Sequence, residues 1–254
     1  MRYGLIGGKL GHSYSKIIHE KLADYKYDLI PLEEDKLHEF MIQKNFAGIN
    51  VTIPYKQKVI PYLNELDSLA KEIGAVNTIV NNDGYLIGYN TDFYGIVYLI
   101  QNNKINIKNK KCFVLGNGGT SKTAQVALKH LGAKKVTVVS RKKTQTTITY
   151  EEAYKDYTDT EIVVNTTPVG MYPLVDASPL DLSTFSKCQA VIDVIFNPLD
   201  TKIVQQARDL CITSVSGLEM LVAQAKMAAE LFLVKKIPEE IIDDIYKELI
   251  DTIH

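Results

Sequence analysis

The stretch Leu115-Gly116-Asn117-Gly118-Gly119-Thr120-Ser121-Lys122-Thr123 is the part of the sequence that decides the fold. It follows a short apolar run that predicts a strand, and it opens a segment with apolar residues at helical spacing. Gly116 and Gly118 match the first two positions of the dinucleotide-binding pattern G-x-G-x-x-G, and Ser121 supplies a small residue at the third. Glycines let the backbone approach a pyrophosphate, and a helix N-terminus adds N–H donors. The stretch therefore predicts a strand, turn and helix that bind a dinucleotide.

The same residues nearly match a second phosphate-binding motif, the P-loop G-x-x-x-x-G-K-[ST]. Aligned from Gly116 to Thr123, the chain has Ser121 where the P-loop needs a glycine that lets the loop wrap the phosphates. The paired Gly118-Gly119 suits a dinucleotide turn better. A P-loop phosphotransferase stays open as an alternative function, and a glycine-rich turn without a ligand stays open as the structural alternative.

The next predicted strand, Val136–Ser140, bears on the choice of cofactor. NAD-specific sites place a carboxylate after this strand to bind the ribose 2′-hydroxyl, whereas an Arg there accommodates a 2′-phosphate. Here Arg141-Lys142-Lys143 follows, without an acidic residue. The sequence therefore favours NADP, with a solvated basic turn as the alternative.

Strand and helix signals alternate on both sides of these residues, which is typical of parallel α/β architecture. Before the polar stretch 101–111, strands are predicted at Tyr3–Gly7, Tyr27–Leu32, Ile49–Ile53, Asn77–Val80 and Leu86–Tyr89. After it, strands are predicted at Cys112–Leu115, Val136–Ser140, Glu161–Asn165, Ala190–Ile195 and Ile212–Val215, and helices at Thr120–Leu131, Thr201–Leu210, Leu218–Val234 and beyond Pro238. The polar stretch has little to bury, so it is predicted to link two domains.

Local signals in the first third predict a turn and two helix starts. Asn82-Asp83-Gly84 predicts a hairpin, because Asp-Gly tolerates positive φ. Thr91 or Asp92 is expected to cap the helix that follows the hairpin. One of Ser13 and Ser15 is likewise expected to cap a helix, which leaves the other serine to be explained.

Polar side chains gather at the ends of several predicted strands of this first third. They are Asn50, Thr52, Lys56, Asn77, Thr78, Asn90, Thr91 and Asp92. Each alone suits a turn or a cap, but open α/β sheets bind ligands at the carboxyl ends of their strands. A set of hydroxyls, amides, one Lys and one Asp suits a small polyhydroxylated acid.

The composition argues against several classes of protein. The 254 residues are 46% hydrophobic and 23% charged, which is the balance of an ordinary globular protein. A net charge of −1 argues against nucleic acid or an anionic membrane as the partner. No apolar run approaches the roughly 20 residues of a membrane span, no signal-peptide pattern is present, and the histidines lack metal-ligand spacing. Three widely spaced cysteines indicate reduced thiols. We expect a cytoplasmic protein that binds no metal.

Seven motifs follow one another along the chain. They are Gly11-His12-Ser13-Tyr14-Ser15, Asn50-Val51-Thr52-Ile53-Pro54-Tyr55-Lys56, Gly74-Ala75-Val76-Asn77-Thr78, Gly88-Tyr89-Asn90-Thr91-Asp92, Gly116–Lys122, Asn165-Thr166-Thr167-Pro168 and Ser216-Gly217-Leu218-Glu219-Met220-Leu221-Val222-Ala223-Gln224. In these motifs and their order the chain resembles the shikimate dehydrogenase family, over essentially its whole length. The resemblance implies a two-domain α/β fold. A substrate domain with an open, mainly parallel sheet would span 1–100, completed by C-terminal helices at 217–254, and a Rossmann-like dinucleotide-binding domain would span 101–216.

The resemblance also implies an activity, the reversible NADP-dependent reduction of 3-dehydroshikimate to shikimate in aromatic amino-acid biosynthesis. It implies Lys56 and Asp92 as the catalytic pair. It implies that the substrate is bound by Ser13, Ser15, Asn50, Thr52, Asn77, Asp92 and Gln224. It implies that the cofactor is bound by Gly116, Asn117, Gly118, Gly119, Ser140, Arg141, Lys142, Thr166, Val194 and Gly217. The implied partner is this small molecule alone, and the chain is expected to be a monomer or a homodimer.

Three features depart from the family pattern. Gln145 stands where a second Arg usually binds the cofactor, so binding of the 2′-phosphate is expected to rest on Arg141 and the neighbouring lysines. Phe196 stands where a tyrosine is usual, so one hydroxyl contact to the substrate is expected to be missing. The run 144–157 lacks apolar periodicity, so the helix after the second strand is expected to be short or irregular.

Two alternatives share the predicted fold. A quinate/shikimate dehydrogenase that uses NAD is disfavoured by the pair Ser13 and Ser15 and by the missing acidic residue after Ser140. A dinucleotide sensor without catalytic activity is disfavoured because Lys56 and Asp92 are both present.

Overall fold

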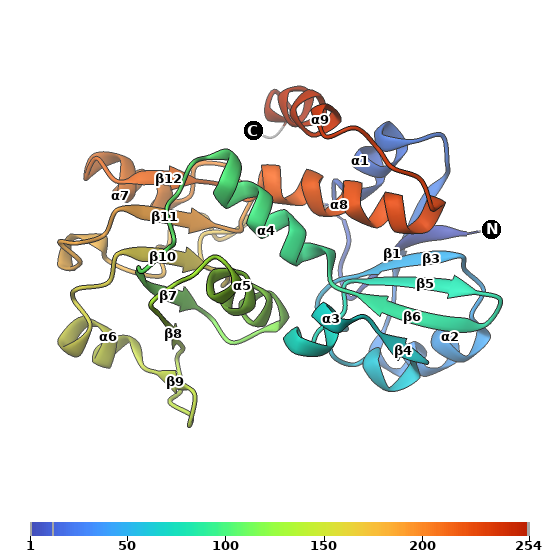
Figure 1. The fold of residues 1–254 in the computed structure, drawn as a ribbon, viewed down its shortest axis with the longest axis horizontal. Coiled ribbons are helices and arrows are strands. Elements are labelled where there is room, and N and C mark those ends of the chain that lie inside the picture. The colour runs from blue at the N-terminus through green and yellow to red at the C-terminus, as the bar shows by residue number, and fades with distance from the viewer. Residues whose placement is uncertain (1, 12, 253–254) are drawn as a thin grey trace. The chain divides into compact units, whose positions relative to one another are not determined.

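Short apolar strands alternate with helices along the chain, and the strands assemble into two separate six-stranded sheets (Figure 1). The computed structural model describes residues 2–11 and 13–252. Its contacts divide the chain into unit 1, Met1–Tyr94 with Val222–Ile245, and unit 2, Gly95–Leu221 with Tyr246–His254. Each unit carries one of the two sheets, so the predicted two-domain α/β fold is confirmed.

The sheet of unit 1 has the strand order β2-β1-β3-β5-β6-β4. Its strands are β1 (Tyr3–Gly7), β2 (Tyr27–Pro31), β3 (Gly48–Val51), β4 (Glu65–Leu66), β5 (Thr78–Asn82) and β6 (Tyr85–Tyr89). β1 pairs in parallel with β2 and β3, and β4 pairs in parallel with β6, whereas β5 is antiparallel to both of its neighbours. β5 and β6 form the predicted hairpin, where Asp83 and Gly84 have φ of 50° and 91°.

Helices from both ends of the chain belong to this unit. Those within unit 1 are α1 (Ser15–Leu22), α2 (Leu37–Gln43) and α3 (Ser68–Ile73), and those that contribute residues to both units are α4 (Thr91–Asn102), α8 (Leu218–Leu233) and α9 (Glu240–Ile250). Ala228 and Phe232 of α8 share a buried core with Leu5 and Tyr27. A Cβ at Gly48 would lie 2.2 Å from a ring carbon of Phe232, so α8 needs a glycine on β3.

The sheet of unit 2 is parallel throughout, with the order β12-β11-β10-β7-β8-β9. Its strands are β7 (Lys111–Leu115), β8 (Lys135–Val139), β9 (Thr147–Ile148), β10 (Ile162–Asn165), β11 (Ala190–Asp193) and β12 (Thr213–Val215). Its helices are α5 (Gly119–His130), α6 (Tyr150–Asp156) and α7 (Lys202–Asp209). Numbered from β7, the order is the 3-2-1-4-5-6 of dinucleotide-binding folds, whose ligand crevice lies where the strand order reverses, here between β7 and β10.

Two predicted helix caps are wrong. The residue before α4 is Asn90, whose Oδ1 accepts a hydrogen bond from the Phe93 N–H at 3.2 Å. Thr91 and Asp92 therefore lie inside the first helical turn. Neither serine caps α1, because its N-cap residue is Tyr14 and Ser13 Oγ accepts from the Ser15 N–H at 3.3 Å.

The helix after β8 is short, as expected. α6 has seven residues and starts with a capping box, in which Thr149 Oγ1 accepts from the Glu152 N–H and the Glu152 carboxylate accepts from the Thr149 N–H. The predicted domain limits at residues 100 and 217 lie inside α4 and just before α8, and they stay a prediction. Within the described part of the chain, every helix is too short or too polar to cross a membrane.

Candidate active site

One edge of the unit 1 sheet collects the polar residues predicted at strand ends. Asn50 lies opposite Thr78 in the pairing of β3 with β5, and Thr78 lies opposite Tyr89 in the pairing of β5 with β6. The end of β3, the start of β5 and the end of β6 therefore meet at this edge. Residues that follow β3, precede β5 or follow β6 emerge side by side.

Lys56 and Asp92 form a close ion pair at this edge. Lys56 Nζ lies 2.6 Å from Asp92 Oδ2, and the two side chains are 13% and 8% exposed. The backbone places Lys56 there, because the Val76 N–H donates to the Lys56 carbonyl at 2.7 Å and the neighbouring Tyr55 ring is buried. A pair so little exposed keeps more of its attraction than a surface pair, since water screens it less. The arrangement holds an ammonium at a fixed place beside a carboxylate.

Asn77 is the centre of the hydrogen bonds around this pair. Its Oδ1 accepts from the Thr91 N–H at 2.7 Å, which fixes the orientation of the amide. Its Nδ2 then donates to Asp92 Oδ1 at 2.9 Å. Asp92 is thus held by a donor on each carboxylate oxygen, Asn77 on one and Lys56 on the other.

Gln224 reaches the same cluster from α8. Its Oε1 lies 3.4 Å from Asn77 Nδ2 and 3.3 Å from Thr91 Oγ1, so residues far apart in the sequence meet here. Asn50 joins the cluster through Nδ2, which donates to Thr78 Oγ1 at 3.0 Å. The structure therefore brings together five predicted site residues, namely Lys56, Asp92, Asn77, Gln224 and Asn50.

Ser13, Ser15 and Thr52 lie in segments that leave the same sheet edge. β1 and β3 are parallel neighbours, so the segments that follow these two strands leave the sheet at the same edge. The Gly8 N–H donates to the Ile53 carbonyl at 3.0 Å, which ties the segment after β1 to the segment after β3. The assignment of these three hydroxyls to the substrate stays a prediction.

The sequence places Thr78 and Thr91 in the polar set at the strand ends but gives neither a specific role. Thr78 is fully buried and Thr91 is 2% exposed, and their hydroxyl oxygens lie 3.1 Å apart. Their hydroxyls meet the amides because of the register of β5 against β3 and β6, which local sequence does not reveal.

The glycine turn of unit 2 has the shape that a dinucleotide needs. Gly116 has φ of 102°, a conformation that favours glycine. At Gly118 a Cβ would meet nothing within 4 Å, and Asn117 and Gly118 are exposed. The first turn of α5 has neither a side-chain cap nor an acidic residue, so its positive end suits an anion.

Ser121 distinguishes this turn from a P-loop. Its side chain is fully buried, and its Oγ donates to the Gly116 carbonyl at 2.7 Å. The hydroxyl thus closes the turn on itself, where a P-loop needs a glycine and an open loop around the phosphates. The geometry favours the dinucleotide interpretation.

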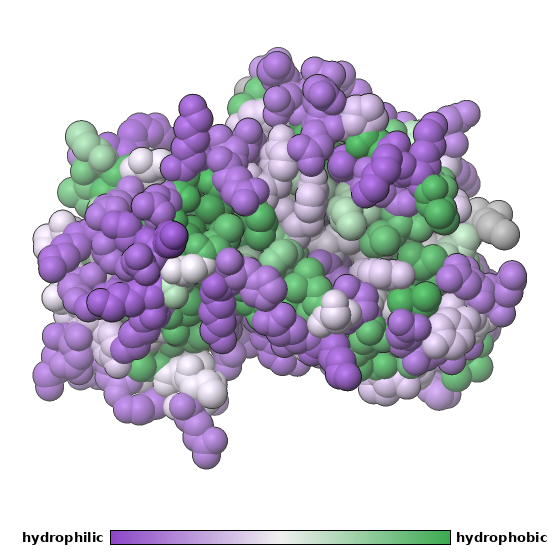
Figure 2. Space-filling model, viewed as in Figure 1, coloured by the Kyte–Doolittle hydropathy of each residue, from purple (hydrophilic) through white to green (hydrophobic). Residues whose placement is uncertain are grey.

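The turn after β8 carries the predicted basic residues. Arg141 and Lys142 are exposed, and this turn forms a hydrophilic tip at the lower edge of Figure 2. Lys143 is engaged by an ion pair with Glu152. Ser140 Oγ donates to the Lys142 carbonyl, so this hydroxyl shapes the turn. Two cations, Arg141 and Lys142, are therefore placed to meet a phosphate.

Asp193 fixes the ends of β10 and β11, next to three predicted cofactor residues. Its Oδ1 accepts from Asn165 Nδ2 at 3.0 Å and from the Ile195 N–H at 3.1 Å, and its Oδ2 accepts from Thr201 Oγ1 at 2.6 Å. The adjoining cofactor residues are Thr166, Val194 and Gly217. A Cβ at Gly217 would lie 2.1 Å from the Val194 carbonyl oxygen, so only glycine fits.

Asp193 predicts a pH dependence of stability. Burial raises its pKa to about 6, although three hydrogen bonds oppose the shift. Between about pH 4 and pH 6 the folded chain keeps a proton that the unfolded chain releases, so the free energy of unfolding falls as pH rises through this window. Asp193→Asn removes this dependence, about 1.4 kcal/mol per pH unit. Urea unfolding from pH 4 to pH 7 measures it.

The Asn variant suits this test because its amide can keep all three hydrogen bonds. Oδ1 still accepts from Asn165 and Ile195, and Nδ2 can donate to Thr201 Oγ1. Parallel stability curves for the wild type and the variant would contradict the assignment.

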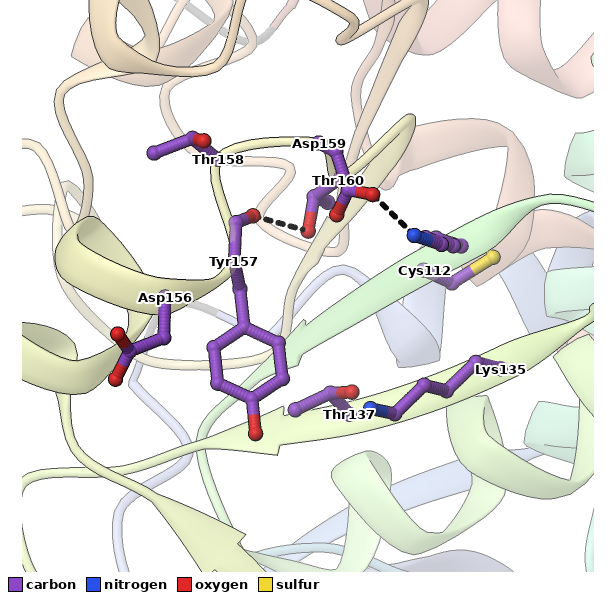
Figure 3. Close-up of a pocket in the computed structure, with 9 residues that line it drawn as sticks. Cys112, Lys135, Thr137, Asp156, Tyr157, Thr158, Asp159 and Thr160 are labelled. Atoms are coloured by element: carbon purple, nitrogen blue, oxygen red, sulfur yellow. Dashed lines mark hydrogen bonds and ion pairs between the residues drawn. The ribbon is translucent and has the colours of Figure 1, made fainter.

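A pocket of about 230 Å³ lies at the opposite, amino-terminal edge of the unit 2 sheet (Figure 3). Both of its lysines are already engaged, because Lys111 pairs with Asp159 and Lys135 Nζ lies 5.0 Å above the centre of the Tyr157 ring. Nucleotides bind at the carboxyl ends of such strands, so this pocket is not the dinucleotide site.

Comparison with known proteins agrees with this geometry. Residues 5–79 match the family model described as "Shikimate dehydrogenase substrate binding domain". The chain is 41% identical to a shikimate dehydrogenase (NADP(+)) of Clostridium beijerinckii, over 91% of each chain. It superposes on shikimate dehydrogenase 1 from Peptoclostridium difficile with a TM-score of 0.91, at 34% identity over 98% of each chain.

A further solved structure contains ligands. Shikimate 5-dehydrogenase from Thermus thermophilus, in complex with NADP(H) and shikimate, superposes with a TM-score of 0.86 at 25% identity, over 98% of this chain and 99% of that one. These matches extend over nearly the whole length of both partners. Together with the polar cluster and the glycine turn, they show that the chain belongs to the shikimate dehydrogenase family.

Proposed function

We propose that this chain catalyses the reversible, NADP-dependent reduction of 3-dehydroshikimate to shikimate. The observation that carries the proposal is the close pair of Lys56 and Asp92 inside a cluster of amides and hydroxyls. The relatives named shikimate dehydrogenase (NADP(+)) support both the reaction and the cofactor. The P-loop alternative is disfavoured by the relatives and by the closed turn at Ser121.

Lys56 and Asp92 supply the proton chemistry of the reaction. Reduction of a carbonyl needs a hydride at carbon and a proton at oxygen, and charge develops on that oxygen in the transition state. When bound, NADPH supplies the hydride. Lys56 Nζ stabilises the developing alkoxide and donates its proton to the oxygen, and Asp92 Oδ2 holds Nζ in place through the 2.6 Å contact. In the oxidation direction Lys56 Nζ takes the proton back.

The surrounding groups suit a ring with several hydroxyls and one carboxylate. Asn77 donates hydrogen bonds to Asp92 and to Gln224, and the three side chains offer donors and acceptors beside Lys56. Ser13 and Ser15, helped by Thr52, would bind the carboxylate. Asn50 completes the substrate set, although its amide protons are already donated to Thr78 Oγ1 and the Asn77 carbonyl.

The residues of unit 2 fit NADP. Gly116, Asn117, Gly118 and Gly119 would hold the pyrophosphate at the start of α5, whose first turn has no acidic residue. Ser140, Arg141 and Lys142 would hold the 2′-phosphate, and no carboxylate follows β8 to repel it. The remaining contacts would come from Thr166, Val194 and Gly217.

Arg141→Ala is expected to weaken NADP binding about ten- to a hundredfold and to change NAD binding little. Arg141 can offer two parallel N–H donors to the phosphate, and a charge-assisted hydrogen bond is worth about 1.5–3 kcal/mol. Exposure of the turn pulls the effect toward the lower end, because salt screens exposed charges. The measurement is kcat/KM for both cofactors.

Lys143→Ala is the matched control, because Lys143 is already paired with Glu152. It should leave the preference for NADP intact. A wild-type preference for NAD, or equal losses with both cofactors in Arg141→Ala, would mean that the basic residues form only a solvated turn.

The proposed function is tested by absorbance at 340 nm with the purified chain. Shikimate with NADP should give the highest kcat/KM, and shikimate with NAD and quinate with either cofactor should give lower values. Faster turnover of quinate with NAD would favour the quinate/shikimate alternative. ATP hydrolysis is the control for a phosphotransferase, and binding of NADP without turnover would indicate a sensor.

We also propose that the chain works in the cytoplasm as a monomer or homodimer, with the small-molecule substrate as its partner. Its cysteines are unpaired, and Cys112 and Cys188 are buried, which suits a reducing compartment. Light scattering coupled to size exclusion would measure the assembly.

A further inference from the structure

Tyr27 lies outside the predicted site but contacts Asn50 and helix α1, the helix that begins at Ser15. It opens β2 and is fully buried in unit 1. Its hydroxyl lies 2.7 Å from Asn50 Oδ1. Its ring stacks on the His19 ring of α1, with centroids 4.0 Å apart and planes 7° from parallel.

Helix α1 also holds the backbone of Tyr27. Lys16 Nζ donates to the Tyr27 carbonyl at 2.8 Å, and the Tyr27 N–H donates to Glu20 Oε1 at 3.2 Å. The N-terminal end of α1 carries Ser13 and Ser15, which are candidates for binding the substrate carboxylate. Tyr27 therefore joins the helix of the serines to the amide of Asn50.

The direction of the hydrogen bond between Tyr27 and Asn50 is determined by chemistry. Asn50 Nδ2 lies 3.2 Å from the Asn77 carbonyl oxygen, which can only accept, so the amide must point its nitrogen that way. Oδ1 then faces Tyr27, whose hydroxyl must donate. Burial keeps it able to do so, because it raises the phenol pKa well above the ordinary value.

The same hydrogen bonds continue to the catalytic pair. Thr78 Oγ1 accepts from Asn50 and lies 3.2 Å from Asn77 Oδ1, to which it can donate. Asn77 in turn donates to Asp92, which holds Lys56. A shift of the Asn50 amide would therefore be passed to the carboxylate that orients Lys56 Nζ.

We propose that Tyr27 is a positioning residue for the active site, which sets the Asn50 amide and keeps the serine end of α1 in register with Lys56 and Asp92. The proposal rests on the proposed function for its kinetic consequences. Its structural part, that the Tyr27 hydroxyl orients the amides of Asn50 and Asn77, does not depend on which reaction the chain catalyses.

The test is Tyr27→Phe, with Tyr25→Phe as the matched control. The Tyr25 hydroxyl hydrogen-bonds with His19 Nδ1. Both variants therefore remove one hydroxyl from a tyrosine whose ring packs against the ring of His19. We expect Tyr27→Phe to lower kcat/KM for shikimate about tenfold, because the Asn50 amide loses the donor that orients it and the shift is passed through Asn77 to Asp92. KM for NADP should not change, and Tyr25→Phe should behave as the wild type.

A double-mutant cycle separates positioning from general loosening. If Tyr27 acts through Asn50, then Tyr27→Phe should have little further effect in an Asn50→Ala background. Additive losses, or an equal loss of kcat/KM in Tyr25→Phe, would overturn the proposal. If Tyr27→Phe does not fold, Thr78→Val serves as the second variant, because it removes the hydroxyl that accepts from Asn50 Nδ2. We expect a comparable loss of kcat/KM in Thr78→Val. Wild-type kcat/KM in this variant would count against the proposal.

A second measurement does not depend on activity. The side-chain ¹⁵N–¹H signals of Asn50 and Asn77 should shift in Tyr27→Phe and stay in place in Tyr25→Phe. If they shift as expected while the wild type does not turn over shikimate, the proposed function fails and the positioning role stands. If they do not shift, the positioning role fails even when the enzyme is active.

Discussion

Lys56→Ala is expected to lower kcat by about 10²–10⁴-fold, the range for loss of a general acid–base group. Lys56 Nζ is the cation that contacts Asp92 Oδ2, and alanine leaves no group to stabilise the developing alkoxide or protonate it. Binding of NADP should change little, because the predicted cofactor residues all belong to unit 2. Steady-state kinetics and a cofactor titration measure the two effects.

Lys58→Ala is the matched control for this variant. Lys58 is two residues away and forms an exposed ion pair with Glu34, and exposed pairs contribute little to stability. Near wild-type kcat in Lys56→Ala, or an equal loss in Lys58→Ala, would remove Lys56 from the mechanism.

Asp92→Asn is expected to lower kcat by about 10²-fold or more, with NADP affinity nearly unchanged. The two carboxylate oxygens accept from Lys56 Nζ and Asn77 Nδ2. An amide has only one oxygen, so in either orientation its NH₂ faces one of these donors. The substitution also removes the negative charge that holds the ammonium. Kinetics with shikimate and NADP, over a range of both, will separate kcat from the two KM values.

Asp83→Asn is the matched control for Asp92→Asn, because it makes the same change of charge away from the candidate site. Asp83 is exposed in the β5–β6 turn with φ of 50°, where asparagine is also well tolerated. It should retain wild-type kcat. If Asp92→Asn retains it as well, the carboxylate is not needed for turnover and the pair is only a structural contact.

Much of the fold could be predicted because its signals are local. β1 covers the residues expected of it, and α5 lies within one residue of its predicted limits at each end. These segments combine strong apolar periodicity with clear stop signals, such as Gly132 after α5, where φ is 83°. The glycine turn was found for the same reason, since its sequence pattern and its geometry are both confined to a few residues.

Elements that depend on distant partners could not be predicted. β4 and β9 have two residues each and exist only through their pairing with β6 and β8. α2 is seven residues long and buries only Leu37 and Met41, which is too little periodicity to identify a helix. Propensity is weak in such short elements, and tertiary pairing decides them.

The start of α4 illustrates the same limit within the candidate site. Asn90, Thr91 and Asp92 are all good capping residues, so the local sequence cannot choose among them. The choice is made by Asn77, whose Oδ1 takes the Thr91 N–H, while Asn90 takes the Phe93 N–H. This arrangement puts Asp92 inside the helix with its carboxylate toward Lys56.

The contribution of α8 to unit 1 has a consequence for how the chain emerges from the ribosome. The first 94 residues of unit 1 are made long before Ala228 and Phe232, which cover Leu5 and Tyr27. At the usual 5–20 residues per second, the intervening segment 95–221 takes roughly 6 to 25 s to synthesise. For that time the nascent sheet lacks its cover and Asn77 lacks Gln224. Unit 2 has most of its chain by then, so the nucleotide-binding part can fold first, and the protein becomes able to recognise its substrate only in the last moments of its synthesis.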